Sequence, residues 1–193
     1  SPSTFLRRPI SVNFVDRATN RLWLLVAAVG DGTRRLAQLR VGDTLNCVLP
    51  LGNSFTMPTL PEQKILLVGG GVGVAPLLYF GKLICDFGAE PTFLLGARSA
   101  EDLLEVDEFR KYGRVFMTTE DGTYGEQGFV TNHSILQTES FDQISTCGPK
   151  PMMMAVARFA HANGIACEVS LENKMACGVG ACLCCVEKTT DGN

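Results

Sequence analysis

The chain has 193 residues, of which 46% are hydrophobic and 19% are charged, and its formal net charge is −3. This length and hydrophobic content are sufficient for one large or two small globular domains. The weak negative charge provides no basic surface for nucleic acid, and no apolar run is long enough to span a membrane. Eight cysteines without a secretory signal favour reduced thiols and metal chemistry in the cytoplasm.

The first sixty residues predict short antiparallel strands. Alternating apolar side chains predict strands over residues 5–15 and 21–29, and a third over Leu45–Leu49. Between the second and third, Gly30–Thr33 predicts a tight turn with free amide groups, and residues 34–39 a helical turn. Three such strands are typical of part of an antiparallel β-barrel but are too few to close one. We therefore expect upstream strands and a chain that is part of a longer protein, since it does not begin with Met.

Beyond residue 60 the pattern changes to alternating strands and helices. The continuous apolar run Lys64–Val68 predicts a strand of a parallel sheet that is covered on both faces. Further predicted strands cover residues 91–96, 114–119, 143–147 and 165–171, and predicted helices end near residues 87 and 163, with helical turns over 100–104 and 107–112. This alternation favours an α/β doubly wound sheet.

Two turns after predicted strands have residue types that suit a bound nucleotide. The glycine turn, Gly69–Leu77, lies between a strand and a helix, where glycines let the backbone approach a pyrophosphate near the helix N-terminus. It departs from the G-x-G-x-x-G pattern, so a simple tight turn remains an alternative. Cys147 follows a later strand, and ligands of open α/β sheets bind beyond the carboxyl ends of strands. We therefore expect Cys147 near the ligand of the glycine turn, although a buried apolar thiol is the simpler alternative.

A short loop near the end of the sequence contains half of the eight cysteines. Cys177, Cys182 and Cys185 have the spacing C-x4-C-x2-C, which is the plant-type pattern of a [2Fe–2S] cluster. One loop must turn several thiolates towards two irons, and Gly178 and Gly180 permit the backbone angles that this needs. The same glycines allow amide N–H groups to approach the cluster sulfurs.

Two other sites are compatible with these cysteines. A zinc site is disfavoured because no second C-x2-C pair or His-x3-His follows, and a disulfide because adjacent Cys184 and Cys185 do not easily bridge each other. A plant-type cluster needs a fourth ligand. Either the given sequence is cut short before that ligand, which we favour, or Cys184 or Cys167 takes its place.

The motifs occur in an order that resembles a known superfamily. They are Arg8–Ser11, Gly30–Thr33, Gly69–Leu77, Cys147–Pro149 and the cysteine loop. In this order they resemble the ferredoxin–NADP reductase superfamily. Within it, the chain is similar to the electron-transfer subunits of NAD-dependent dihydroorotate dehydrogenase, the PyrK family, through Leu6–Ser11, Glu120–Gly125 and Leu171–Gly178. The resemblance covers nearly all of the chain.

The resemblance implies three parts and one activity. Residues 1–60 would form an incomplete FAD-binding β-barrel domain, residues 61–165 an NAD-binding α/β domain, and residues 166–193 a truncated [2Fe–2S] segment. The family implies a cytoplasmic oxidoreductase subunit of pyrimidine biosynthesis. It would pass electrons from a PyrD-type catalytic subunit through the cluster and FAD to NAD+, in a heterotetramer with two copies of each subunit.

The resemblance also assigns roles to single residues. Arg8 would pair with a flavin phosphate, Ser11 would hydrogen-bond the flavin ring near N5, and Cys147 would pack near the nicotinamide. The implied catalytic residues are therefore Cys147 and Ser11. The implied cofactor-binding residues are Arg8, Pro9, Ile10, Ser11, Gly32, Thr33, Gly70, Gly71, Gly73 and Pro76, and the implied metal ligands are Cys177, Cys182 and Cys185. Ile10 stands where many members have a tyrosine that stacks on the flavin.

Two other functions remain open at this point. One is a flavin/iron–sulfur subunit of a bifurcating transhydrogenase or a sulfide dehydrogenase, and the other is a non-catalytic zinc or interaction module. The resemblance favours NAD over NADP, although Arg98 follows the second strand of the nucleotide domain, where it is able to meet a 2′-phosphate. His133 and His161 are expected to be ordinary surface or helix residues, and no Ser/His/Asp arrangement is found.

Overall fold

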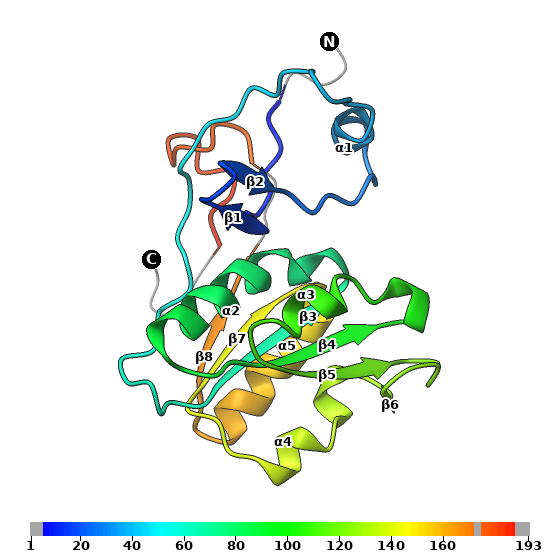
Figure 1. Cartoon of the computed structure of the whole chain (residues 1–193), viewed down its shortest axis with the longest axis vertical. Helices are drawn as coiled ribbons and strands as arrows, with labels where there is room; N and C mark the ends of the chain where they lie inside the picture. The colour runs from blue at the N-terminus through cyan, green and yellow to red at the C-terminus, as the bar shows by residue number, and fades with distance from the viewer. Residues whose placement is uncertain (1–5, 172–174, 188–193) are drawn as a thin grey trace. The chain divides into compact units, whose positions relative to one another are not determined.

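The structure is a computed structural model that describes residues 6–171 and 175–187. The chain divides into two compact units. Unit 1 comprises residues 1–10, 26–54 and 171–193, and unit 2 comprises residues 11–25 and 55–170. Figure 1 labels the helices and strands of both units, and each unit is described here by itself.

Among the described residues, unit 2 contains a six-stranded parallel sheet in the order β6-β5-β4-β3-β7-β8. The strands are β3 (Ile65–Gly70), β4 (Thr92–Ala97), β5 (Arg114–Thr119), β6 (Glu126–Gln127), β7 (Gln143–Cys147) and β8 (Ala166–Val169). The predicted parallel α/β sheet is therefore confirmed. Strand β3 is central, with β4 on one side and β7 on the other, so the order of the sheet reverses beside β3. Ligands of such sheets bind at this reversal, beyond the carboxyl ends of the strands.

Helices cover both faces of the sheet (Figure 1). Helices α2 (Ala75–Phe87) and α3 (Val106–Phe109) pack on one face, and α4 (Ile135–Thr138) and α5 (Lys150–Ala162) on the other. Short 3-10 turns are η1 (Gly71–Val74), η2 (Ala100–Asp102) and η3 (Val130–Asn132). Because successive strand residues point to opposite faces, Leu67 joins the α2 core while Leu66 and Val68 join the α5 core. No helix within the described ranges is both long and apolar enough to cross a membrane.

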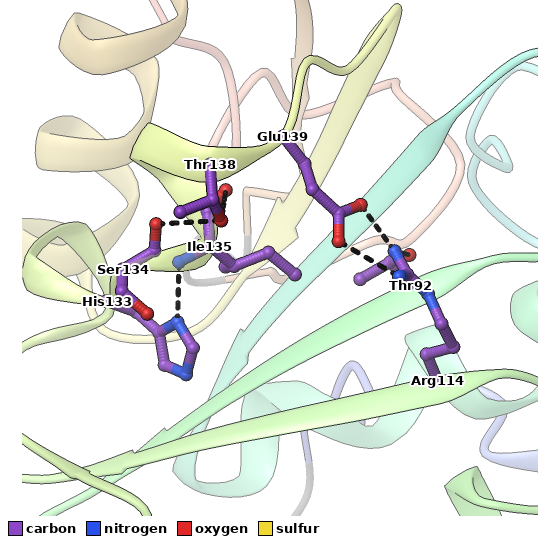
Figure 2. Close-up of polar contacts among 7 residues, drawn as sticks. All are labelled: Thr92, Arg114, His133, Ser134, Ile135, Thr138 and Glu139. Atoms are coloured by element: carbon purple, nitrogen blue, oxygen red, sulfur yellow. Dashed lines mark hydrogen bonds and ion pairs between the residues drawn. The ribbon is translucent and has the colours of Figure 1, made fainter.

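Helix α4 is fastened at both ends by polar contacts (Figure 2). Before the helix, Nδ1 of His133 accepts the backbone N–H of Ile135 at 3.0 Å. After it, Glu139 accepts two hydrogen bonds from Arg114, at 2.9 and 2.6 Å, and Arg114 also donates to Thr92 at 3.0 Å. His133 is only 5% exposed, so the expectation that it is an ordinary surface or helix residue is wrong. Its ring is buried because it satisfies an amide at the start of α4.

The first part of the chain has less strand than the alternation predicts. Strands β1 (Phe14–Asp16) and β2 (Arg21–Trp23) form an antiparallel pair in which Phe14 lies opposite Trp23. The strands predicted over 5–15 and 21–29 thus shrink to three residues each among the described residues. The third predicted strand, Leu45–Leu49, is wrong. An alternating pattern becomes a strand only where a second strand accepts its backbone hydrogen bonds, and no described segment pairs with it.

Unit 1 contains helix α1 (Asp31–Leu36), whose first turn occupies most of the predicted Gly30–Thr33 turn. Every fully buried hydrophobic side chain among the described residues lies between Ile65 and Ala160, which is within unit 2. In unit 1, large apolar side chains are exposed instead: Leu6, Val29, Leu39, Val41, Leu45, Val48, Leu49, Leu51, Leu171, Val179, Leu183 and Val186. The described part of unit 1 is therefore held together without a buried apolar core.

Candidate functional site

The glycine turn and the Cys147 turn meet at the reversal of the sheet. Gly69 and Cys147 lie opposite each other in the β3–β7 register. A Cβ atom added to Gly73 would lie 2.4 Å from Cα of Gly148 and 2.7 Å from the carbonyl oxygen of Cys147. The two backbones therefore touch, so Cys147 lies beside the glycine turn. Its expected place near a ligand of that turn stays a prediction.

The three glycines predicted to bind a pyrophosphate differ in their surroundings. A Cβ on Gly70 would lie 2.6 Å from Sδ of Met152 in α5 and 3.3 Å from Cδ of Pro149, so Gly70 packs closely against the start of α5. Gly71 has a φ of +54° and would meet no atom within 4 Å. It combines a backbone conformation that favours glycine with open space beside it. Gly71 is thus the glycine of the turn at which a ligand has room to approach.

Helix α2 begins directly after this turn. Pro76 lies in its first turn, where a missing N–H removes no helical hydrogen bond. The first amide groups of a helix and its dipole favour an anion, and α2 is thirteen residues long. An exposed glycine backbone followed by a helix N-terminus fits the diphosphate of a dinucleotide.

Cys147 lies at the carboxyl end of β7 and is 2% exposed. It belongs to the apolar core beneath the glycine turn, together with Val74 and Leu77. The thiol therefore forms part of the floor at the point where the two turns meet. Its predicted contact with a nicotinamide ring stays a prediction.

Strand β4 ends beside a small polar group, of which only Arg98 was expected from the sequence. Nε of Arg98 lies 3.6 Å from Oδ2 of Asp102, and Oγ of Ser99 is 3.4 Å from the same oxygen. Thr123 joins this group, because its hydroxyl accepts the N–H of Ala100 at 2.9 Å. The sequence does contain a signal for this group. In dinucleotide-binding folds an acid after the second strand binds a ribose hydroxyl, and Asp102 follows β4.

In unit 1, Arg8 lies against the first turn of α1. A Cβ on Gly32 would lie 2.6 Å from Nε of Arg8, so the guanidinium lies directly beside the backbone of Gly32. Nη1 of Arg8 donates to the carbonyl oxygen of Leu6 at 2.7 Å. The hydroxyl of Thr33 accepts the N–H of Gly30 at 3.0 Å and donates to the carbonyl oxygen of Gly30 at 3.1 Å. An exposed arginine beside a glycine amide fits a phosphate, whereas the Thr33 hydroxyl is already used by the backbone.

The remaining residues of the predicted flavin motif are consecutive in sequence. Pro9 is exposed, and Ile10 and Ser11 are half-buried. The division between the two units falls between Ile10 and Ser11. Arg8, Gly32 and Thr33 belong to unit 1, and Ser11 belongs to unit 2.

One thiol of the cysteine loop, that of Cys177, has a lowered pKa. Sγ of Cys177 accepts the backbone N–H of Val179 at 3.5 Å. This N–H, followed by hydrogen bonds from the backbone and side chain of Cys182, lowers the pKa of Cys177 to about 6. Gly178 and Gly180 have φ values of +74° and +78°, as the turn towards a sulfur requires. Metal ligation needs the thiolate, so this arrangement fits a metal or cluster ligand.

The structure brings Cys177 and Cys182 together but does not complete a metal site. Among the described residues, no three His, Cys, Asp or Glu side chains gather closely enough to hold a metal ion. Of the two alternative fourth ligands, Cys184 is exposed. Burial, with a smaller effect of Glu168, raises the pKa of the Cys167 thiol, which is the opposite of what a ligand needs.

Comparison with known proteins identifies the family. Residues 67–158 match the family model described as the oxidoreductase NAD-binding domain. The dihydroorotate dehydrogenase B (NAD(+)) electron transfer subunit of Shouchella clausii (strain KSM-K16) is 40% identical over 194 residues, which is 100% of this chain and 74% of the relative. This chain belongs to the family of dihydroorotate dehydrogenase B electron transfer subunits. As a member of this family it is an oxidoreductase subunit, and unit 2 carries its NAD-binding domain.

Solved structures of other proteins share the fold of this chain. One comes from a study of flavin-based electron bifurcation by the NADH-dependent reduced ferredoxin-NADP oxidoreductase; it is 33% identical, with a TM-score of 0.84 over 93% of this chain and 66% of that chain. Another is the flavohemoglobin of Malassezia yamatoensis with bound FAD and heme, which is 19% identical, with a TM-score of 0.73 over 86% of this chain and 46% of that chain. The second likeness concerns the fold alone.

Proposed function

We propose that this chain passes electrons from a catalytic subunit, which oxidises dihydroorotate, through a [2Fe–2S] cluster and FAD to NAD+. Its family membership, at 40% identity over its whole length, carries the proposal. Dihydroorotate loses two electrons and two protons, NAD+ gains two electrons and one proton, and the second proton goes to solvent. A flavin supplies the exchange between one-electron and two-electron transfer that this reaction needs.

The proposal includes an assignment of parts. Residues 1–60 belong to an FAD-binding antiparallel β-barrel domain, residues 61–165 to the NAD-binding domain, and residues 166–193 to the cluster-binding segment. The antiparallel β1–β2 pair and the contact of Arg8 with Gly32 support the first assignment. The assembly is a cytoplasmic heterotetramer with two copies of each subunit.

For NAD, we assign the diphosphate to the exposed backbone of Gly71 and the N-terminus of α2. Gly70 and Gly73 keep the two turns close enough for the dinucleotide to cross both carboxyl ends. Cys147 lies beneath, where its small buried thiol provides an apolar contact for the nicotinamide. The open space at Gly71 and the contact between the turns support this assignment.

For FAD, we assign one phosphate to the guanidinium of Arg8 and the amide of Gly32. Arg8 presents several N–H donors in a fixed plane, which suits a phosphate. Ser11 donates a hydrogen bond to the flavin ring near N5, and Ile10 gives an aliphatic contact in place of a stacked tyrosine. Thr33 contributes indirectly, because its hydroxyl holds the Gly30 backbone at the start of α1.

For the cluster, we assign Cys177, Cys182 and Cys185 as thiolate ligands. The amide of Val179 already points at Sγ of Cys177, and such N–H groups stabilise sulfur that carries negative charge. The low pKa of Cys177, about 6, favours the thiolate at neutral pH. Together with the C-x4-C-x2-C spacing, these contacts support the assignment.

The first experiment is a visible absorption spectrum of the protein prepared without oxygen, before and after NADH. The expected result is a spectrum with flavin bands and a broad iron–sulfur absorbance, both bleached by NADH. A colourless protein would contradict the proposal, and bound zinc in such a sample would favour a non-catalytic module. If NADPH bleached the spectrum as fast as NADH, the assignment of NAD as the physiological nucleotide would be contradicted.

A second candidate function is supported by one comparison. The structure of the NADH-dependent reduced ferredoxin-NADP oxidoreductase is 33% identical to this chain. A subunit of such an enzyme would exchange electrons with ferredoxin rather than with a dihydroorotate-oxidising partner. Purification of the natural complex separates the two, because orotate formation coupled to NAD+ reduction is expected only for the first function.

A further inference from the structure

Asn13 connects three elements of unit 2 and is 2% exposed. Its backbone N–H donates to the carbonyl oxygen of Trp23 in β2 at 3.0 Å, and its carbonyl oxygen accepts the N–H of Tyr79 in α2 at 3.2 Å. Its side-chain Nδ2 donates to Oε1 of Glu105 at 2.8 Å. Ser11, the proposed flavin contact, is two residues earlier, so the position of Asn13 constrains the position of Ser11.

Glu105 begins α3 in an unusual conformation. Its φ of +55° and ψ of +24° are left-handed, a conformation that costs a residue other than glycine about 1–2 kcal/mol. Its carbonyl oxygen accepts the N–H groups of Glu108 and Phe109, at 2.9 and 3.1 Å. These bonds and the bond from Asn13 hold Glu105 in place, with its carboxyl group turned towards Asn13.

The contact between the two side chains leaves two buried acceptors unsatisfied. Oδ1 of Asn13 and Oε2 of Glu105 are both inaccessible to solvent, and neither has a hydrogen-bond partner among the described residues. An ionised Glu105 has no proton to offer, so it would leave both oxygens unpaired and would bury a negative charge. One proton on Oε2 would turn that oxygen into a donor, and Oδ1 of Asn13 is the buried acceptor left unpaired in the same contact. The two hydrogen bonds would then form a ring between a carboxylic acid and a carboxamide.

We propose that Glu105 is protonated in the folded protein at neutral pH and forms this neutral ring with Asn13, as a positioning pair for the segment that carries Ser11. The proton on Glu105 comes from solvent when the chain folds and returns to solvent when the chain unfolds. The consequence for a flavin rests on the proposed function, whereas the protonation of Glu105 does not.

The charged surroundings agree with a neutral carboxyl group. Burial raises the pKa of Glu105, the hydrogen bond from Asn13 lowers it, and the negative charge of Glu108 raises it again. The packed elements also carry Lys111, which pairs with Glu108, Arg110, which pairs with Asp107, and Lys82, which pairs with Asp86. Asp16 accepts hydrogen bonds from Ala18 and Thr19, and it interacts electrostatically with Arg21. The remaining titratable groups there are Cys85, Tyr79 and Tyr112.

Infrared spectroscopy of the full chain at pH 7 tests the proposal directly. A protonated carboxyl group has a carbonyl stretch that is separate from the bands of ionised carboxylates. We expect this band in the parent protein and in the control Glu101→Gln, which changes an exposed glutamate, but not in Glu105→Gln. Absence of the band from the parent, or its persistence in Glu105→Gln, would overturn the proposal.

The pH dependence of unfolding gives a second, independent readout. A raised pKa in the folded state means that the folded protein retains a proton that the unfolded chain loses above a pH of about 4.3. Relative to Glu105→Gln, the unfolding constant of the parent should therefore rise about tenfold per pH unit, or about a hundredfold from pH 5 to pH 7. Parallel pH profiles would contradict a protonated Glu105. Altered flavin binding plays no part in either test, so failure of the proposed function remains distinguishable.

Discussion

At the scale of single residues, Gly73 is where the two turns at the site are closest. In Gly73→Ala the new methyl group would meet Gly148 at 2.4 Å, and backbone cannot retreat as a flexible side chain can. We expect the free energy of unfolding to fall by about 1–3 kcal/mol, with weaker NADH binding. Urea denaturation and NADH titration measure both effects. Gly30→Ala is the control, since its methyl group would meet no atom within 4 Å and should cost less than about 1 kcal/mol.

Asp102 is the residue that we expect to select the nucleotide. Its carboxylate lies near Arg98 and Ser99, just after the end of β4. The negative charge of this carboxylate would repel a 2′-phosphate bound there. In Asp102→Asn, Arg98 is free to meet that phosphate, and the ratio of kcat/KM for NADPH to that for NADH should rise about tenfold, which corresponds to roughly 1.4 kcal/mol. Asp107→Asn, at the start of α3, should leave the ratio unchanged. An unchanged ratio in Asp102→Asn would remove Asp102 from nucleotide selection.

At the scale of secondary-structure elements, α4 depends on a neutral histidine. Burial lowers the pKa of His133, while the charge of Glu126 raises it less. The stability that His133 provides is therefore complete above the unfolded pKa of about 6.5. It is lost as the pH falls below that value, by up to about 1.4 kcal/mol per pH unit. Between pH 7.5 and 5.5, His133→Gln should show a flatter stability profile than the parent, and His161→Gln, an exposed change in α5, the same profile as the parent.

The elements that could be predicted are those with an apolar signal of their own. Strands β3, β4, β5 and β7 agree with the predicted ranges to within two residues. Burial on both faces explains the apolar run Ile65–Val68 in β3, whereas β7 also contains the buried polar residues Ser145 and Thr146. Strand β6 is two polar residues, Glu126–Gln127, and helix α4 is one turn, so neither has a detectable period. The alternation at Leu45–Leu49 has the right period for a strand but no described partner, which local sequence does not reveal.

The part of the candidate site that could be predicted is where the glycine turn meets Cys147, because the positions of these residues after strands indicate backbone geometry. The approach of the glycine turn to Cys147 followed from the rule that strand ends share one edge of a parallel sheet. The burial of His133 and the pairing of Asn13 with Glu105 were not predictable. The His133 ring bonds an amide only two residues away and packs edge-on against Phe116, whereas Asn13 and Glu105 are 92 positions apart. None of these contacts leaves a periodic signal in the sequence.

At the scale of the whole molecule, the cluster ligands should separate two activities. In Cys182→Ser we expect electron transfer to or from the catalytic partner to fall to background, because a plant-type cluster requires each of its thiolate ligands. NADH-dependent reduction of a flavin-reactive dye should remain, since it bypasses the cluster. Cys184→Ser is the matched control in the same loop. Loss of both activities in Cys182→Ser would count against a role confined to the cluster, and loss of partner transfer in Cys184→Ser would make Cys184 a ligand.

The absence of buried apolar side chains from the described part of unit 1 has a consequence for how the molecule unfolds. A segment without an apolar core contributes little to the heat-capacity change of unfolding and opens at low free energy. Backbone amides of unit 1 should therefore exchange with deuterium well before those of β3 and β4. Whatever binds unit 1 in its folded form, whether phosphate, flavin or iron, will then raise its stability by mass action. Thermal denaturation of the protein without cofactors should therefore show one transition, that of unit 2, and its midpoint temperature would not describe unit 1.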